Sequence, residues 1–429
     1  MHIFPRSSPE SAPSVIPTEA AFHEAILASS SSVRDSLPKE HHKHFETLRQ
    51  EIIDFASSHD IPRESLAKPD DLREAASKLS TPDLKRLANL LERFEYLLKN
   101  KEPRKEDYIE ALEHAERLYH LEEQYTSQVK LLEQVGILKD GVITGIDGKQ
   151  YLIPTLEQIA SRLFERREEL STKHDQGFTK LLLVPFGMSL DNLREVLRQF
   201  LLDYKENNPS FDLDTDRPLR IWEEGYQGAD IGDSPKLVYH PQSFIQDGHG
   251  GKTKMEILKT NYQLPTLTPT QSPFPGWTIH LFQPSNLESQ DTETPIGFAL
   301  IPQQGQGTPQ GDLTPRPPLE TGRSSKEYLA TLQEAQNNPN HPYSQESGMT
   351  PEDWIMAFMT HLSETKKPLD DVWNPTNTES HCYLTGAFFP SSVFVPYVYW
   401  NRDNHQAGLS GNDPRNRFGN IGARFSVMV

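Results

Sequence analysis

The spacing of apolar residues changes along this chain, and that change limits the fold more than any single motif. Before residue 136 the spacing is helical: Leu84, Leu87, Leu91 and Phe94 lie three or four residues apart, on one stripe of a helix that begins near Thr81. After residue 178, short apolar runs alternate with long polar loops, a pattern typical of short strands. We therefore predict an α+β protein in which a helical N-terminal region precedes a mixed domain.

Composition divides the chain further. Residues 1–17 are rich in Ser and Pro and are predicted to be disordered. Residues 18–136 are predicted to form a helical bundle or coiled-coil-like domain, and residues 137–177 a hairpin and a connecting helix. Residues 178–429 then form the second domain. Because apolar helical stripes must be buried, the N-terminal helices pack either on one another or on a partner, and a homo-oligomer formed through them remains an open alternative.

Charge and cysteine content exclude several classes of protein. A net charge of −18 argues against a general nucleic-acid-binding protein, since binding to phosphates needs clustered Lys and Arg. The single cysteine, Cys382, excludes an internal disulfide and a multi-cysteine metal site, and it favours a reducing compartment. Neither a signal peptide nor a membrane-spanning apolar run is recognisable, so we expect a cytoplasmic protein without a membrane span.

Three motifs suggest chemistry, and each has a simpler explanation. The segment 248–254 (GHGGKTK) resembles a phosphate loop, but Gln246 stands where such a loop needs glycine, so a turn before a helix is favoured. The histidines within 41–44 point in different directions on a helix, which favours a solvated face over a metal site. Cys382 and the adjacent His381 point to opposite faces of a strand. We therefore predict no enzyme activity, no catalytic residue, no metal and no cofactor.

The C-terminal segment has an unusual composition. From His381 to Val427, 47 residues, there is no Lys, Glu or Met, although the whole chain is 24% charged. Strands with tight loops are depleted in Lys and Glu, which explains part of this bias. It does not explain why the long charged side chains that remain are all Arg. The chain then closes on an apolar run, Ala423 to Val429, that predicts a buried strand.

Several motifs together resemble one family. The chain contains LLLVPFGMSLDNL, HGGKTKMEIL, SGMTPEDW, YLTGAFFPSS and, at its end, YW…A.L…DP…GAR.SV. From about Phe178 to Val429 it resembles the variable proteins of diversity-generating retroelements of bacteria, archaea and phages. The resemblance implies a C-type lectin fold of the formylglycine-generating-enzyme type. It also implies gene-level partners: a reverse transcriptase that copies a template RNA with errors at adenines, so that the copy replaces a variable region of the gene.

The implied mechanism makes a prediction about composition. Asparagine codons randomised at both adenines never encode Lys, Glu, Gln, Met or Trp. Of these five residue types, the segment from His381 to Val427 contains only Trp400 and Gln406. Trp400 fits a position that is not diversified, whereas Gln406 requires a different template codon. The composition therefore agrees with the resemblance, apart from Gln406.

The resemblance divides the variable region, about 395–424, into two sets of positions. A scaffold set would hold the segment in place: Tyr399, Trp400, Ala407, Leu409, Asp413, Pro414, Gly422, Ala423 and Arg424. A second set would face outward and bind an unknown ligand, either a protein or another macromolecule: Asn401, Arg402, Asp403, Asn404, His405, Gln406, Gly408, Ser410, Gly411, Asn412, Arg415, Asn416, Arg417, Phe418, Gly419, Asn420 and Ile421. Mixed polar side chains around an aromatic anchor suit such a surface.

Departures from the wider fold class limit what the resemblance implies. Trp400-Asn401 is followed by Arg402, which removes a carboxylate that calcium-dependent sugar binding needs, and one cysteine cannot support formylglycine chemistry. The fold also implies paired terminal strands, so we expect Leu181–Pro185 to run antiparallel beside Ala423–Val429. An alternative function stays open: a non-catalytic structural or regulatory protein that assembles through its N-terminal helices, with C-terminal loops that are only structural.

Overall fold

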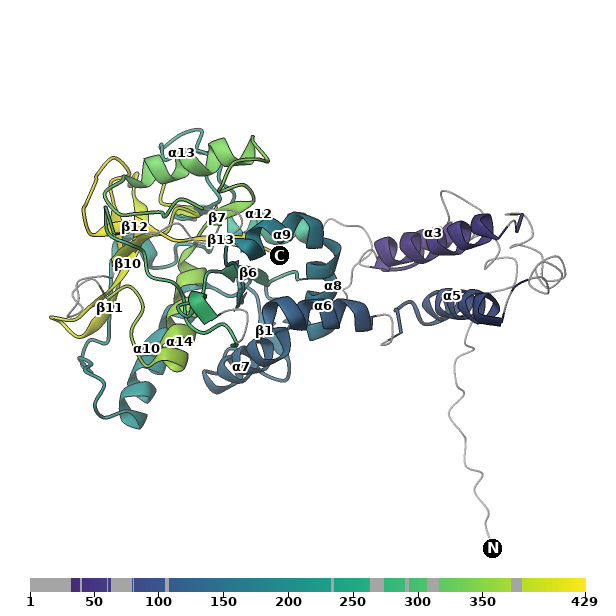
Figure 1. Ribbon diagram of the computed structural model, residues 1–429. Helices are drawn as coiled ribbons and strands as arrows, with labels where there is room; N and C mark the ends of the chain where they lie inside the picture. The colour runs from purple at the N-terminus through teal and green to yellow at the C-terminus, as the bar shows by residue number, and fades with distance from the viewer. Residues whose placement is uncertain are drawn as a thin grey trace, which may run out of the picture. The chain divides into compact units, whose positions relative to one another are not determined.

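The chain divides into two compact units, Met1–Ile109 and Glu110–Val429. A computed structural model describes residues 32–38, 41–59, 61–62, 79, 81–104, 108–232, 235–262, 274–289, 293–306, 316–371 and 380–429 (Figure 1). The segment 1–17, predicted to be disordered, lies outside the described residues. No helix among those ranges is both long and apolar enough to cross a bilayer.

In the described part of the first unit, two long helices pack against each other. The short helix α2 (Ser32–Asp35) precedes α3 (His42–Ser58), which packs against α5 (Thr81–Asn100). Phe45 of α3 and Phe94 of α5 are fully buried, with their ring centroids 5.1 Å apart. The predicted stripe therefore forms the contact between the helices, except at its beginning, where Leu84 is 44% exposed.

The boundary between the units lies at residue 109 and not near residue 136, where the helical spacing ends. The helices α6 (Ile109–Tyr119) and α7 (Leu121–Gln134) belong to the second unit because their buried residues, such as Ala115 and Leu132, join its main core. The hairpin predicted within 137–177 follows as β1 (Val142–Thr144) and β2 (Gln150–Leu152), with Asp147-Gly148 in the turn between them. Helices α8 (Leu156–Glu165) and α9 (Arg167–Asp175) complete this part.

A four-stranded antiparallel sheet lies at the centre of the second unit. Its order is β3 (Lys180–Val184), β6 (Thr278–Phe282), β13 (Phe425–Met428) and β7 (Glu346–Gly348). The predicted pairing of the first and last strands was wrong. Leu281 of β6 lies between Leu181 and Val427, and two antiparallel pairings leave β3 and β13 running in the same direction. Residues 279–282 of β6 are buried on both faces, as expected of a strand inside a covered sheet, but β3 at the edge is buried throughout as well, so burial alone does not set the strand order.

Two glutamine side chains close the outer edge of this sheet. The amide of Gln124 accepts from Leu181 N at 2.9 Å and donates to Thr179 O at 3.0 Å. One helical turn later, the amide of Gln128 accepts from Leu183 N at 2.8 Å and donates to Leu181 O at 2.7 Å. Helix α7 therefore satisfies the backbone groups that an edge strand would otherwise expose.

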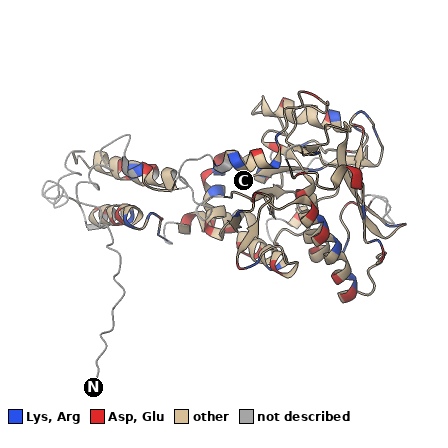
Figure 2. Cartoon of the chain, turned by 180° about the vertical axis from the view of Figure 1, so that it is seen from behind, with Lys and Arg blue, Asp and Glu red and all other residues tan. Residues whose placement is uncertain are grey.

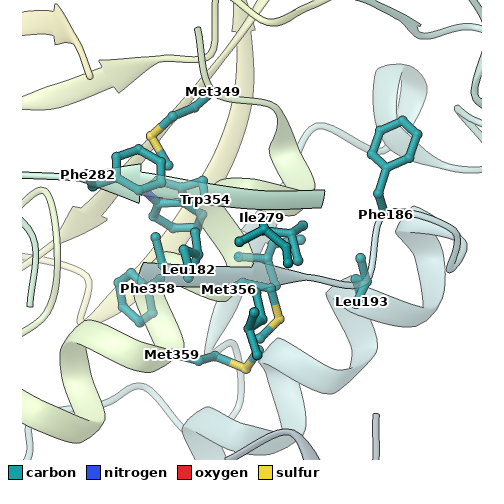
Figure 3. Close-up of a cluster of buried hydrophobic side chains, with 14 of the residues drawn as sticks. Leu182, Phe186, Leu193, Ile279, Phe282, Met349, Trp354, Met356, Phe358 and Met359 are labelled. Carbon is teal, nitrogen blue, oxygen red and sulfur yellow. The ribbon is translucent and has the colours of Figure 1, made fainter. Parts of the chain in front are cut away.

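Two long helices lie beside this sheet: α14 (Pro351–Thr365) packs on β3, and α10 (Leu190–Asn207) packs on α14. Ser189 caps helix α10, because its side chain accepts from Asn192 N. Helix α14 begins with a capping box between Thr350 and Asp353. Figure 3 shows Trp354 and Phe358 of α14 directed toward Leu182 of β3. On its outer side α10 carries acidic and basic residues in alternation (Figure 2).

A second sheet has five strands. Its order is β12 (Ile421–Ala423), β8 (His381–Tyr383), β10 (Val395–Asn401), β11 (Gln406–Asn412) and β4 (Leu219–Ile221). The second unit also contains smaller elements: α11 (Glu223–Tyr226), β5 (Val238–Tyr239), α12 (Lys254–Tyr262), α13 (Ser325–Gln336) and β9 (Ala387–Phe388). The final apolar run is therefore not one strand, because Arg424 separates β12 in one sheet from β13 in the other. Helices and several sheets together confirm the α+β class.

Candidate binding surface

The hairpin of β10 and β11 positions most of the proposed surface. Trp400 pairs with Ala407 and Val398 with Leu409, so these four side chains share the face of the hairpin that points into the core. All four are 3% exposed or less. Trp400 lies 5.2 Å from the ring of Phe211 and 6.0 Å from that of Phe358. Three residues expected as scaffold, Trp400, Ala407 and Leu409, are therefore buried.

Arg424 fixes the end of the segment from within. Its guanidinium donates to Asp370 Oδ1 at 2.9 Å and Oδ2 at 3.2 Å, and to Ala299 O at 3.1 Å. Asp370 is 2% exposed and also accepts from Trp354 Nε1 at 2.8 Å. Two bonds between a guanidinium and a carboxylate fix both groups in one plane. The pair therefore joins the end of β12 to α14 and to the segment that follows it.

The opposite face of the hairpin carries stacked rings. Tyr399 lies 4.6 Å from His381 and 5.6 Å from Tyr397, with the rings nearly parallel. Gly408 lies beside Tyr399, and a Cβ at this glycine would come within 2.3 Å of the tyrosine ring. Burial raises the pKa of Tyr399, and Tyr397 adds to this rise, whereas a hydrogen bond from the exposed Arg220 lowers it. Tyr399 is thus buried as expected of scaffold, but on the face away from Trp400.

The remaining scaffold positions are also held by contacts. Pro414, Gly422 and Ala423 are buried. Asp413 is half-buried and accepts from Arg415 N at 2.9 Å and from its side chain, which lowers the pKa of Asp413 to about 2. An aspartate that accepts from the backbone two residues later stabilises a turn, the role expected of Asp413-Pro414.

The residues expected to face outward separate into three groups. Eight are exposed: Arg402, Asp403, Asn404, Arg415, Asn416, Arg417, Phe418 and Gly419. Six are half-buried: Asn401, His405, Ser410, Gly411, Asn412 and Asn420. Three are buried, which corrects the expectation: Gln406, Gly408 and Ile421. Gly408 lies against Tyr399, Ile421 packs in the core cluster around Tyr328, and the side chain of Gln406 turns back to Asn404 O.

The eight exposed residues lie at two ends of the hairpin. Residues 402–405 form the turn between β10 and β11, next to the Asn401–Gln406 pair. Residues 413–420 leave the other end of β11, where Asn412 pairs with Val395, and lead to β12. Of these strands, β12 contacts α13, and Figure 1 shows the β11 end of the hairpin farther from that helix. The exposed positions therefore make two patches on one hairpin.

Both patches are attached to parts of the chain that the tail sequence alone does not reveal. Arg402 Nε donates to Asp371 Oδ2 at 3.1 Å, and Arg417 forms an ion pair with Glu327 of α13. Lys326 N donates to Pro414 O at 3.1 Å, and Thr321 Oγ1 donates to Gly419 O at 2.6 Å. The backbone of 413–420 is thus held on the first turn of α13 and on the segment just before it.

Phe418 combines a fixed backbone with a free side chain. Its carbonyl oxygen accepts from Gly322 N at 3.1 Å, while its ring is 40% exposed. An exposed aromatic ring on an ordered backbone loses little conformational entropy when a partner covers it. Phe418 therefore has the geometry of an anchor residue.

Two buried clusters resemble catalytic sites but lack access. Ser426 Oγ lies 3.0 Å from His280 Nδ1, and His280 Nε2 lies 3.4 Å from Asp353 Oδ1. All three residues are at most 2% exposed, so a substrate does not reach the hydroxyl. Lys254 of the glycine-rich motif is fully buried and donates to Met188 O at 2.7 Å. It also pairs with Glu352 at 2.8 Å, which leaves it unavailable to a phosphate.

Cys382 is likewise a core residue. It is fully buried, and burial raises the pKa of its thiol to about 12, so the reactive thiolate is not populated at neutral pH. Within the described ranges, no three side chains of His, Cys, Asp or Glu are placed to hold a metal ion. Comparison with protein-family models, with curated proteins and with solved structures gives no match for this chain.

Proposed function

We propose that this chain is a ligand-binding protein that displays a hypervariable surface on a C-type-lectin-like scaffold, diversified at adenines by a reverse transcriptase and a template RNA. In this proposal the second unit is the scaffold and residues 402–404 and 415–419 are the main contact positions. The ligand is a protein or another macromolecule, since two separated patches suit a broad surface better than a small molecule.

One observation carries the proposal: side-chain burial follows the division that the motif resemblance implies. Scaffold positions such as Trp400 and Leu409 are buried, and most positions of the other set are exposed or half-buried. Exposed residues on ordered backbone can change without loss of stability, whereas buried ones cannot. The composition of the same segment, without Lys, Glu or Met from His381 to Val427, supports diversification at adenines.

Two libraries of the full chain test the surface. The first randomises Asp403, Asn404, Asn416, Arg417 and Phe418, and each library is selected on a panel of unrelated immobilised proteins. The matched control randomises five exposed positions of α10: Asn192, Glu195, Gln199, Asp203 and Glu206. We expect specific binders from the first library only. Equal yields from both would remove the reason to single out the hairpin.

The proposed origin of the diversity has its own test. The DNA beside the gene should contain a near-repeat of the bases that encode the variable region, differing only at adenines, together with a reverse-transcriptase gene. If the neighbouring DNA lacks both, the diversification part of the proposal fails, while the library result still decides whether the hairpin is a binding surface.

A further inference from the structure

An apolar groove lies far from the hairpin in sequence, between the helices α6, α7 and α8. Leu112 of α6, Leu121 of α7 and Leu156 of α8 line it, and its volume is about 510 Å³. Leu112 and Leu156 are only half-buried, so the groove presents apolar surface to solvent. A volume of several hundred Å³ accommodates a few large apolar side chains.

The rim of the groove is mainly acidic. Glu113 and Glu116 of α6 and Glu122 of α7 line it together with one basic residue, Arg117. All four side chains are exposed. Glu116 also accepts from Glu122 N at 2.9 Å, which fixes the elbow between α6 and α7. Three carboxylates against one guanidinium give the rim a negative potential that attracts cationic groups.

We propose that this groove is a docking site for a basic amphipathic helix of a partner protein. Apolar residues at helical spacing on such a helix fill the space between Leu112, Leu121 and Leu156, as in other helix-in-groove complexes. Lys and Arg residues on the flanks of the same helix lie against Glu113 and Glu122. A second copy of this chain, which has a net charge of −18, is a poor occupant, because its carboxylates would repel those on the rim of the groove.

The test uses the full chain and a fluorescent synthetic peptide with Leu and Lys at amphipathic helical spacing, measured by anisotropy. Two further peptides, with Glu in place of Lys or Ala in place of Leu, separate the charge requirement from the apolar one. We expect binding of the first peptide only. Equal binding of the Ala peptide would show that charge alone accounts for the interaction and would overturn the groove assignment.

Matched variants place the site on the protein. Glu113→Lys with Glu122→Lys reverses the rim and should weaken binding of the Leu/Lys peptide by about tenfold or more. Glu168→Lys with Glu206→Lys makes the same change of net charge at exposed positions of α9 and α10, and should weaken binding less than about twofold. Equal weakening by both pairs, or no binding by the unaltered chain, contradicts the proposal. Self-association of the unaltered chain in light scattering, if Glu113→Lys with Glu122→Lys abolishes it, also contradicts the proposal. The occupant of the groove would then be a second copy of this chain.

Discussion

The buried pair between Arg424 and Asp370 makes the most quantitative test of how the hairpin is held. Replacing Asp370 by Asn keeps the size of the side chain and removes only its charge. The backbone at Asp370 has φ +61°, a left-handed conformation that Asn tolerates as well as Asp, so the substitution adds no backbone strain. Any loss of stability therefore reports the contacts of the Asp370 carboxylate with Arg424 and Trp354, and a double-mutant cycle isolates the share of Arg424.

The expected loss follows from the contacts. Arg424 is 8% exposed and gives two of its hydrogen bonds to Asp370, so the substitution removes the charge that Asp370 places against a buried cation. Breaking a buried ion pair from one side costs about 3–5 kcal/mol. Asn can still accept one hydrogen bond, from Arg424 or from Trp354 Nε1, which offsets about 1 kcal/mol. We therefore expect the free energy of unfolding to fall by about 3 kcal/mol.

Urea denaturation followed by tryptophan fluorescence measures the unfolding of the second unit, which contains Asp370 and Arg424, because all five tryptophans of the chain lie in that unit. Arg424→Met, alone and combined with Asp370→Asn, completes a double-mutant cycle, and the double variant should lose less than the sum of the two single losses. Arg417→Gln is the control: its partner Glu327 is at the surface, so it should cost about 0–1 kcal/mol. A loss below about 1 kcal/mol for Asp370→Asn, or strict additivity in the cycle, would refute the reasoning.

Three further predictions concern the hairpin, the glutamine pair and pH. Gly408→Ala brings a Cβ within 2.3 Å of the Tyr399 ring and should lower stability by about 1–3 kcal/mol, whereas Asn404→Ala combined with Phe418→Ala should leave the thermal midpoint unchanged. Gln124→Leu combined with Gln128→Leu removes the hydrogen-bond partners of four backbone groups of residues 179–183. The free energy of unfolding, measured by urea denaturation, should fall by at least about 3 kcal/mol. A smaller loss would mean that water replaces the two side-chain amides. Burial lowers the pKa of His361 to about 3 and of His381 to about 4, from 6.5, so their contribution to stability is full above pH 6.5 and is lost as the pH falls toward 4. His381→Gln should reduce the loss of unfolding free energy between pH 6.5 and pH 4 by up to about 3 kcal/mol. An unchanged loss over this pH range would mean that other groups cause it.

Local chemistry made several elements predictable. Ser189 and Thr350 begin their helices because their side chains accept hydrogen bonds from the first turn, and Asp147-Gly148 turns a hairpin because Gly148 adopts φ +74°. These features depend on residues only a few positions apart. Strand segments such as Lys180–Val184 were also recognisable, because a run of apolar residues buried on both faces has no polar alternation.

Arrangements that depend on distant segments were not predictable. Strand β6 lies between β3 and β13, and it is about a hundred residues from β3 in sequence and still farther from β13. No local pattern encodes pairings between segments so far apart. The periodicity of α6 and α7 identified them as helices but gave no indication of the unit that buries them. In the candidate surface, Gln406 and Ile421 each stand among both polar and apolar residues in the sequence, so the sequence pattern does not show which face of the strand they take. The register of β11 and β12 decides their burial.

Attachments of the surface to other segments were missed for the same reason. Asp371 and Glu327 lie about 30 and 90 residues before the arginines they pair with. The only signal in the sequence was the preference for Arg over Lys, which suits a planar bidentate contact. That preference also follows from codon randomisation, so composition alone does not separate the two causes.

The amides of Gln124 and Gln128 have a consequence for any attempt to isolate the displayed surface. Composition places a natural starting point for such a fragment at residue 137 or 178, and both choices remove α7. The fragment would keep every position of the hairpin and lose the cover of β3, whose free N–H and C=O groups then form a template for another strand. Two fragments would pair through β3, and apparent avidity in a binding assay would come from that pairing instead of the surface. A faithful fragment begins no later than about residue 108.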